Sequence, residues 1–254
     1  MLNLLDYCSL DIHYDMESNV ILYGENIKCN FCQKVTLKNL SPILLNKSLI
    51  YPELVYEEYH GIHNEQDLNL ENGCVSYDLI SLPSGLLGIE FIKTHVFFSA
   101  IDSQEDKVSC IIEVLYGHLF VILQKNVPKD CMDSCTQVDS GYLVKLRQGE
   151  RFVIPEGYLY TFVNASSANI LFSRVYKKSN IVDYAQLKRE RGLAYYCIRK
   201  NGHQEIVLNP FYKNTPAIIE LTADKPLIKP IIKFHLPLYN LLKSELDLVL
   251  TKLA

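Results

Sequence analysis

Short apolar segments recur through the middle of the chain, and they are rich in Val, Ile, Phe and Tyr. Most are bounded by Gly, Pro, Asn or Asp, which favour turns. Short strands at regular spacing, separated by turn signals, are typical of a β-sandwich or barrel. We therefore expect strands at residues 75–82, 88–98, 108–116, 119–123, 142–146, 151–154, 158–163 and 170–175.

The two ends of the chain have a different pattern. Before residue 75 we expect short strands at 20–23 and 54–59, a helix and loop at 38–49, and mainly loop at 60–73. Residues 183–191 predict a short helix that stops at Gly192. Four prolines punctuate residues 214–237, and apolar residues then recur every three or four positions up to Leu253, which predicts an amphipathic helix.

No internal repeat of a two-barrel kind is present in the sequence. We therefore predict one barrel at residues 75–213, an N-terminal extension at 1–74 that packs on it, and a tail with the amphipathic helix at 214–254.

Composition narrows the class of protein. The chain has 254 residues, 48% of them hydrophobic, so it can bury a sizeable core. Its net charge is −4 and no basic stripe stands out, which argues against a nucleic-acid partner. The first residues carry no basic charge and turn acidic at Asp6, and no apolar run approaches the roughly 20 residues of a membrane helix. We expect a cytoplasmic protein without membrane contact.

Eight cysteines raise the question of metal or disulfide chemistry. Cys29 and Cys32 have zinc-ligand spacing, and Cys131 and Cys135 offer a second pair about 100 residues later, which is a weak zinc signal. Thiols in the cytoplasm stay reduced, so we favour free, structural cysteines.

The segment at residues 149–164 resembles the second motif of the cupins, G-(x)5-P-x-G-(x)2-H-(x)3-N. Gly149, Pro155, Gly157 and Asn164 stand in their places. Tyr160 stands where the motif has a histidine that binds a metal inside the barrel. The resemblance implies an all-β fold with a single cupin (jelly-roll) barrel.

A wider resemblance is to the cupin-type, archaeal-style glucose-6-phosphate isomerases. It rests on the order and spacing of residues 55–59, 67–69, 82–94, 183–184 and 192–213, and it covers about residues 20–213. The family isomerises an aldose phosphate to a ketose phosphate with a divalent metal, and it implies a homodimer.

The family's metal-site positions carry other residues here. Residues 94–100 lie on the family's T-x-G-H-x-H-A, so Phe97 and Ser99 replace two histidines. Cys110 replaces the glutamate and Tyr160 the third histidine. A slip of two residues would put His95 on the first position, which still leaves one histidine for four ligands. We therefore expect no metal cofactor and no catalytic residue carried over from the family.

The resemblance also implies that Tyr56, Thr94, Tyr176 and Tyr184 belong to a sugar-phosphate pocket, where hydroxyl groups suit sugar and phosphate oxygens. Four other histidines have no spacing that unites them, so we interpret them as surface or capped side chains rather than a substitute metal site: His60, His63, His118 and His203.

Two functions follow. The first is a degenerate isomerase that binds a sugar phosphate or a protein partner, because the replaced ligands leave no cation to stabilise negative charge on the substrate oxygens. The alternative is a working glucose-6-phosphate isomerase with a rearranged site, acting in glycolysis or gluconeogenesis.

Overall fold

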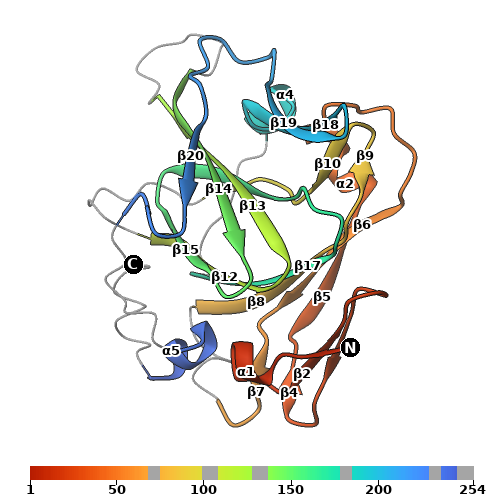
Figure 1. Ribbon diagram of the computed structural model, residues 1–254, viewed down its shortest axis with the longest axis vertical. Coiled ribbons are helices and arrows are strands. Elements are labelled where there is room, and N and C mark those ends of the chain that lie inside the picture. Colours follow the sequence, from red (N-terminus) through yellow and green to blue (C-terminus); the bar gives the residue numbers. More distant parts are fainter. Residues whose placement is uncertain (68–74, 99–107, 128–136, 178–184, 229–235, 245–254) are drawn as a thin grey trace.

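The computed structural model describes residues 1–67, 75–98, 108–127, 137–177, 185–228 and 236–244 (Figure 1). Its elements in chain order are β1 (Leu2–Asn3), α1 (Leu5–Cys8), β2 (Ile12–Asp15), β3 (Val20–Tyr23), β4 (Ile27–Lys28), β5 (Phe31–Thr36), α2 (Leu37–Leu40), the 3₁₀ helix η1 (Ser41–Ile43), β6 (Leu54–His60), β7 (His63–Asn64), β8 (Val75–Leu82), β9 (Leu86–Leu87), β10 (Glu90–Lys93), β11 (Phe97–Phe98), β12 (Val108–Tyr116), β13 (His118–Asn126), β14 (Val138–Arg147), β15 (Arg151–Pro155), β16 (Tyr158–Asn164), β17 (Ile170–Lys177), α4 (Ala185–Arg189), β18 (Tyr195–Lys200), β19 (His203–Leu208), β20 (Ile219–Thr222) and α5 (Leu238–Ser244).

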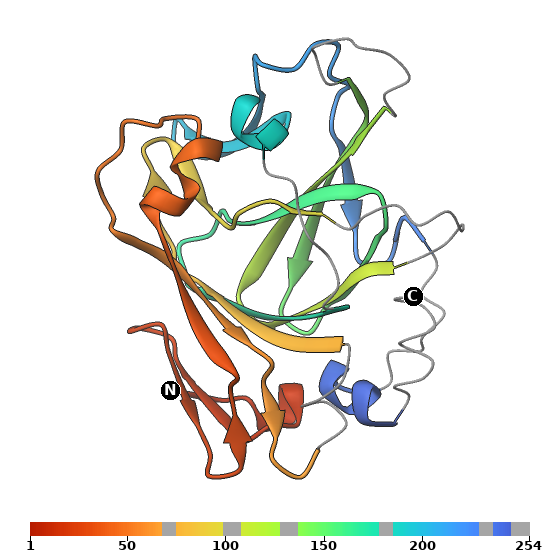
Figure 2. The same ribbon diagram turned by 180° about the vertical axis from the view of Figure 1, so that it is seen from behind.

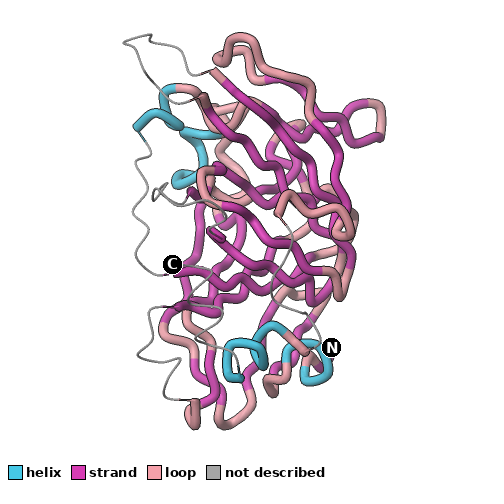
Figure 3. Tube along the Cα trace, turned by 90° about the vertical axis from the view of Figure 1, so that its left-hand side faces the viewer, coloured by secondary structure: helices cyan, strands magenta, loops and turns pink. Residues whose placement is uncertain are grey.

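Two large sheets enclose the main core. Within the described residues, one sheet runs in the order β15-β12-β17-β8-β6-β5, and the other contains β19-β18-β10-β16-β13-β14-β20. Both curve around a common interior (Figures 1 and 2), and apolar side chains from both meet there. The short helices lie towards the two ends of the molecule (Figure 3). The predicted all-β barrel is confirmed.

The expected strand at residues 88–98 is wrong in one respect, because it is divided into β10 and β11. Both pair with β16, but residues 94–96 leave the ladder between them. The side-chain hydroxyl of Thr94 accepts a hydrogen bond from the backbone N–H of Phe162 at 3.1 Å. The backbone N–H of Phe162 thus bonds to the Thr94 side chain, whereas in a continuous ladder it would bond to a backbone carbonyl of the neighbouring strand.

Alternation along the strands separates two cores. On β8, Ile80 and Leu82 face the barrel interior, whereas Tyr77 and Leu79 face the opposite side. A second core on that outer face is covered by the N-terminal elements and by α5. Successive side chains of a strand point to opposite faces, so a strand buried on both sides is apolar in both phases.

Hydrogen-bonded ladders cross both predicted segment boundaries. Strand β6 pairs with β8, and β20 pairs in parallel with β14. The division of the chain at residues 74 and 213 therefore stays a prediction. The two large sheets contain strands from both sides of each boundary. The expected C-terminal helix is present as α5, and residues 245–254 lie outside the described residues.

The turn segment that resembles the cupin motif is held by its asparagine. Asn164 is buried, and its amide donates to the carbonyls of Leu82 at 3.0 Å and Ala168 at 2.9 Å. Its Oδ1 accepts from the backbone N–H of Ser166 at 3.0 Å. This one side chain ties the end of β16 to the end of β8.

We predict that Asn164→Ala lowers the free energy of unfolding by about 1–3 kcal/mol, because it leaves buried backbone groups without partners. Urea unfolding followed by circular dichroism measures the change. Lys200→Ala, which removes only a surface ion pair to Glu205 at 3.0 Å, should change it by less than about 1 kcal/mol. Equal effects from both variants would contradict this role for Asn164.

Candidate functional site

A cavity of about 300 Å³ opens into the barrel between the two sheets. That volume is at the lower end for pockets that bind small molecules. Its lining combines aromatic rings with charged and hydroxyl side chains, from Gln33, Glu58, His60, His95, Phe97, Phe98, Ser109, Tyr160, Arg174 and Tyr176. We call this cavity the barrel pocket.

Strand alternation gathers the charged groups at the barrel pocket. On β17, Arg174 and Tyr176 share the phase of Phe172, which faces the interior. Strand β8 lies beside β17, with Asp78 directly opposite Arg174. Strand β6 follows on the other side of β8 and brings Glu58 and His60.

These four residues form a closely bonded group that we call the charge cluster: Glu58, His60, Asp78 and Arg174. The guanidinium Nη2 of Arg174 lies 3.0 Å from Asp78 Oδ2 and 3.9 Å from Glu58 Oε2. The ring of His60 places Nδ1 2.8 Å from Asp78 and Nε2 3.3 Å from Glu58. All four are buried, so the charges interact with little screening from water.

Nδ1 of His60 is hydrogen-bonded to Asp78, and Nε2 faces Glu58 without a hydrogen bond among the described residues, so both nitrogens face carboxylates that favour the charged ring. Burial lowers the pKa of His60, but the neighbouring Asp78 and Glu58 outweigh it and raise the pKa to about 9. Burial raises the pKa of Glu58, but His95, His60 and Arg174 together lower it to about 2. Burial also opposes ionisation of Asp78, but His60 and Arg174 hold its pKa below the usual value. The charge cluster therefore contains two cations and two anions at neutral pH.

His95 stands beside the charge cluster and is different in character. Its Nδ1 contacts the hydroxyl of Tyr56 and lies 3.4 Å from Glu58 Oε1. Burial lowers the pKa of His95, and the attraction of Glu58 offsets this only in part. We therefore assign a neutral ring to His95 at neutral pH; the ring lowers the pKa of Glu58 at the lower pH where it is protonated.

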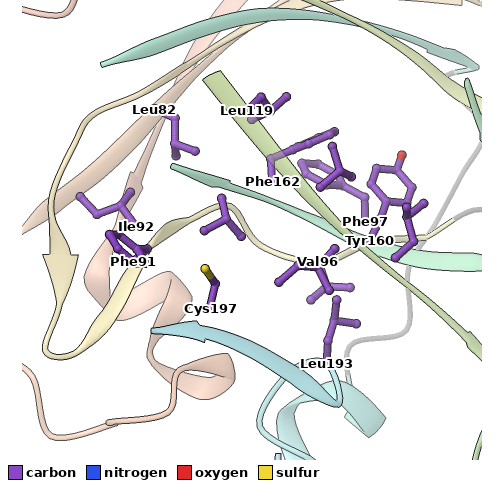
Figure 4. Close-up of a cluster of buried hydrophobic side chains, with 14 of the residues drawn as sticks. Leu82, Phe91, Ile92, Val96, Phe97, Leu119, Tyr160, Phe162, Leu193 and Cys197 are labelled. Atoms are coloured by element: carbon purple, nitrogen blue, oxygen red, sulfur yellow. The ribbon is translucent and has the colours of Figure 1, made fainter. Parts of the chain in front are cut away.

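Aromatic rings fill the space beside Arg174. Its guanidinium carbon lies 4.2 Å from the ring centroids of both Phe97 and Tyr176, which is within cation–π range. The rings of Phe97 and Tyr160 stack at 5.5 Å, and Phe162 joins them (Figure 4). Cys110 is buried in the same core.

The residues predicted to stand at the family's metal positions do not fit a divalent metal. Phe97 offers no donor atom, and burial raises the pKa of the Cys110 thiol to about 12 and that of the Tyr160 phenol well above its usual value, so both stay protonated. The guanidinium of Arg174 lies against Phe97 and would repel a second cation. Ser99 lies outside the described residues. Among the residues that the structure describes, no three His, Cys, Asp or Glu side chains are grouped so as to hold a metal ion.

The expected sugar-phosphate residues occupy different places. Tyr176 lines the barrel pocket. Tyr56 is buried behind it, with its hydroxyl on Glu58 at 2.9 Å. Thr94 is fully buried, and its hydroxyl is bonded to the backbone of His95 and Phe162. Tyr184 lies outside the described residues.

The expectation that no cation is left near the old metal site is wrong, since Arg174 is there. Its position could have been found from the sequence: Tyr176 was assigned to the pocket, and residues two apart on a strand share a face. By the same rule, Tyr56, Glu58 and His60 share one face of β6. Of the histidines read as surface or capped, His118 and His203 are exposed, whereas His60 and His63 are buried with Nδ1 bonded.

Among the described residues no cysteine lines the barrel pocket, and Cys110 is buried in the core beside it. The structure describes Cys29 and Cys32 as free thiols, and burial raises the pKa of both. Cys131 and Cys135 lie outside the described residues.

We predict that the charge cluster makes stability depend on pH on both sides of neutrality. The stabilisation from His60 is complete below its ordinary pKa of 6.5 and is lost as the pH rises through about 9. That from Glu58 is complete above its ordinary pKa of 4.5 and is lost as the pH falls towards about 2. Thermal unfolding midpoints from pH 2 to pH 10 measure both losses.

The matched variants for this experiment are His60→Gln and His203→Gln. His60→Gln should lower the midpoint at pH 6 and flatten the alkaline decline, whereas the exposed His203→Gln should leave the profile of the parent protein unchanged. An unchanged alkaline slope in His60→Gln would contradict the assignment.

The chain matches a family model described as glucose-6-phosphate isomerase (GPI) over residues 45–212. No curated protein sequence matches the chain. No helix among the described residues combines the length and the apolar character needed to cross a membrane.

The chain is also similar to solved structures, at identities of 9–16% for three of them. The Drosophila melanogaster CENP-C cupin domain has 13% identity and a TM-score of 0.30, over 50% of this chain and 74% of that chain. A Bacillus subtilis oxalate decarboxylase has 9% identity and a TM-score of 0.32, over 52% of this chain and 28% of that one. An oxalate oxidase in complex with the substrate analogue glycolate has 16% identity and a TM-score of 0.30, over 48% of each chain.

Proposed function

We propose that this chain, which belongs to the cupin-type glucose-6-phosphate isomerase family, binds a sugar phosphate in the barrel pocket without metal-dependent isomerisation. One observation carries the proposal. Phe97 and Tyr160, which are predicted to stand at the family's metal positions, stack on each other and Arg174 lies against Phe97, yet the cavity beside them stays open at about 300 Å³.

The lining of the barrel pocket suits a sugar better than an apolar ligand. Ligand sites usually combine an apolar wall with a few polar groups that fix orientation. Here Phe97, Phe98 and Tyr176 supply ring surface, while Gln33 and Ser109 supply an amide and a hydroxyl.

The reaction of the family needs negative charge to be stabilised on two neighbouring oxygens while a hydrogen moves between C1 and C2. In the family a divalent metal supplies that charge. The residues at the metal positions do not fit a metal here, so we expect purified protein to contain far less than one manganese, iron, nickel or zinc per chain by elemental analysis. About one metal per chain would contradict this.

The binding prediction uses calorimetry together with a coupled isomerase assay. Fructose-6-phosphate and glucose-6-phosphate should release or absorb heat on binding, while turnover stays far below the roughly 10 per second of an ordinary enzyme, with and without added Mn²⁺ or Fe²⁺. Metal-dependent turnover would overturn the proposal.

Tyr176→Phe removes a hydroxyl from the pocket wall and should weaken binding by about 2- to 10-fold, the loss of one hydrogen bond. Tyr142→Phe is the matched control, because Tyr142 lies on β14 and does not line the pocket. Equal affinities for the two variants would place the ligand elsewhere.

A working isomerase with a rearranged site is the second candidate, and one observation favours it. The cation of Arg174, the carboxylate of Glu58 and the neutral ring of His95 line one cavity. A base at C2 and a fixed positive charge near the oxygens are what an enediol route requires. Turnover in the coupled assay without any added metal would support this candidate over the first.

The homodimer that the family implies stays a prediction. Light scattering over a range of concentrations checks it, and a monomer at every concentration would contradict it.

A further inference from the structure

We propose that Arg174 is the ligand-binding cation of the barrel pocket and that it donates to the neutral hydroxyl and carbonyl oxygens of a sugar, not to a phosphate group. The inference rests on the proposed function, because it assigns which part of the sugar phosphate lies at this residue. Four features of the charge cluster carry it.

The first feature is the place of the guanidinium. Arg174 stacks on Phe97, and Phe97 stacks on Tyr160. Both rings occupy positions that hold metal ligands in the family. A fixed positive charge therefore stands next to the point where the family places its metal.

The second feature is rigidity. The Arg174 side chain is 4% exposed, its guanidinium carbon lies 4.2 Å from the ring centroids of both Phe97 and Tyr176, and Nη2 is tied to Asp78. A guanidinium with these three contacts loses little freedom when a ligand binds, which favours affinity.

The third feature is the set of donors that remain. Nη2 of Arg174 lies 3.0 Å from Asp78 and 3.9 Å from Glu58. The buried Nε has no hydrogen-bond partner within the described part of the chain. An arginine carries five N–H donors, and Arg174 lines the barrel pocket, so donors on its pocket side can take acceptors from a ligand.

The fourth feature is charge balance, and it selects the kind of acceptor. Arg174 and His60 are matched by Asp78 and Glu58, and Glu58 itself lines the barrel pocket. A phosphate dianion at Arg174 would lie beside the Glu58 carboxylate with no surplus positive charge from the cluster, which costs free energy in a poorly solvated site. Hydroxyl and carbonyl oxygens bring no net charge and accept the same N–H groups.

The experiment measures two ligands against two variants by calorimetry. The ligands are fructose-6-phosphate and fructose, which differ only in the phosphate. Arg174→Lys keeps the charge but loses the planar set of donors. If Arg174 contacts the sugar, this variant should weaken both ligands by the same factor, about tenfold for a charge-assisted hydrogen bond.

Arg151→Lys is the matched control. Arg151 also pairs with a buried carboxylate, its Nε donating to Glu113 Oε1 at 2.7 Å, but on the outer face of the same sheet. It should leave both affinities unchanged. A loss confined to fructose-6-phosphate in Arg174→Lys would overturn the inference, since it would place the phosphate at Arg174.

A second measurement needs no variant and remains decisive if Arg174→Lys does not fold. Inorganic phosphate should fail to displace fructose from the parent protein. If phosphate displaces it, or if fructose-6-phosphate binds while fructose does not, the inference is wrong and the proposed function stands. If neither sugar binds, both are wrong.

Discussion

The ion pair between Arg174 and Asp78 is the interaction on which the interior of this barrel depends. An isolated charge in a protein core costs several kcal/mol, so each member persists only because the other is present. Asp78 stands directly opposite Arg174 on the neighbouring strand, and His60 and Glu58 complete the balance. Removing one member leaves an uncompensated buried charge. The four residues therefore act as one unit. Their ion pairs hold the Arg174 guanidinium in its place against the rings of Phe97 and Tyr176.

The replaced metal ligands form a consistent set when Arg174 is considered with them. Imidazole rings that hold a metal present lone pairs to it, whereas the faces of Phe97 and Tyr176 present π-electrons to a guanidinium. The buried thiol of Cys110 and phenol of Tyr160 stay neutral beside that cation. At the positions predicted to match metal ligands, rings and neutral groups thus surround a cation that is covalently attached to the chain.

The sequence was sufficient for the barrel and for part of its interior. Short apolar segments bounded by turn residues predicted β8 and β12 at their observed ends, because such segments are a local property of the sequence. The break at Thr94 could not be predicted in this way, since it depends on a bond to β16, 68 residues away. Strand alternation, applied from Tyr176, was enough to predict that Arg174 faces the barrel interior. The pairing of Arg174 with Asp78 could not be predicted, because it depends on which strands lie side by side and in which register.

The cluster is also more informative about function than about stability. A buried group of ion pairs stabilises a fold no better than apolar side chains of similar size, and often less well. The neighbouring interior shows that this barrel can be filled with such side chains, since Phe162 packs beside Phe97 and Phe172 packs on Phe162. At Arg174 the protein instead keeps four charges, a buried N–H without a partner among the described residues, and an open cavity. A purely structural role explains neither the buried charges, nor the unpartnered N–H, nor the open cavity. A ligand with several oxygens would fill the cavity and supply acceptors to the guanidinium.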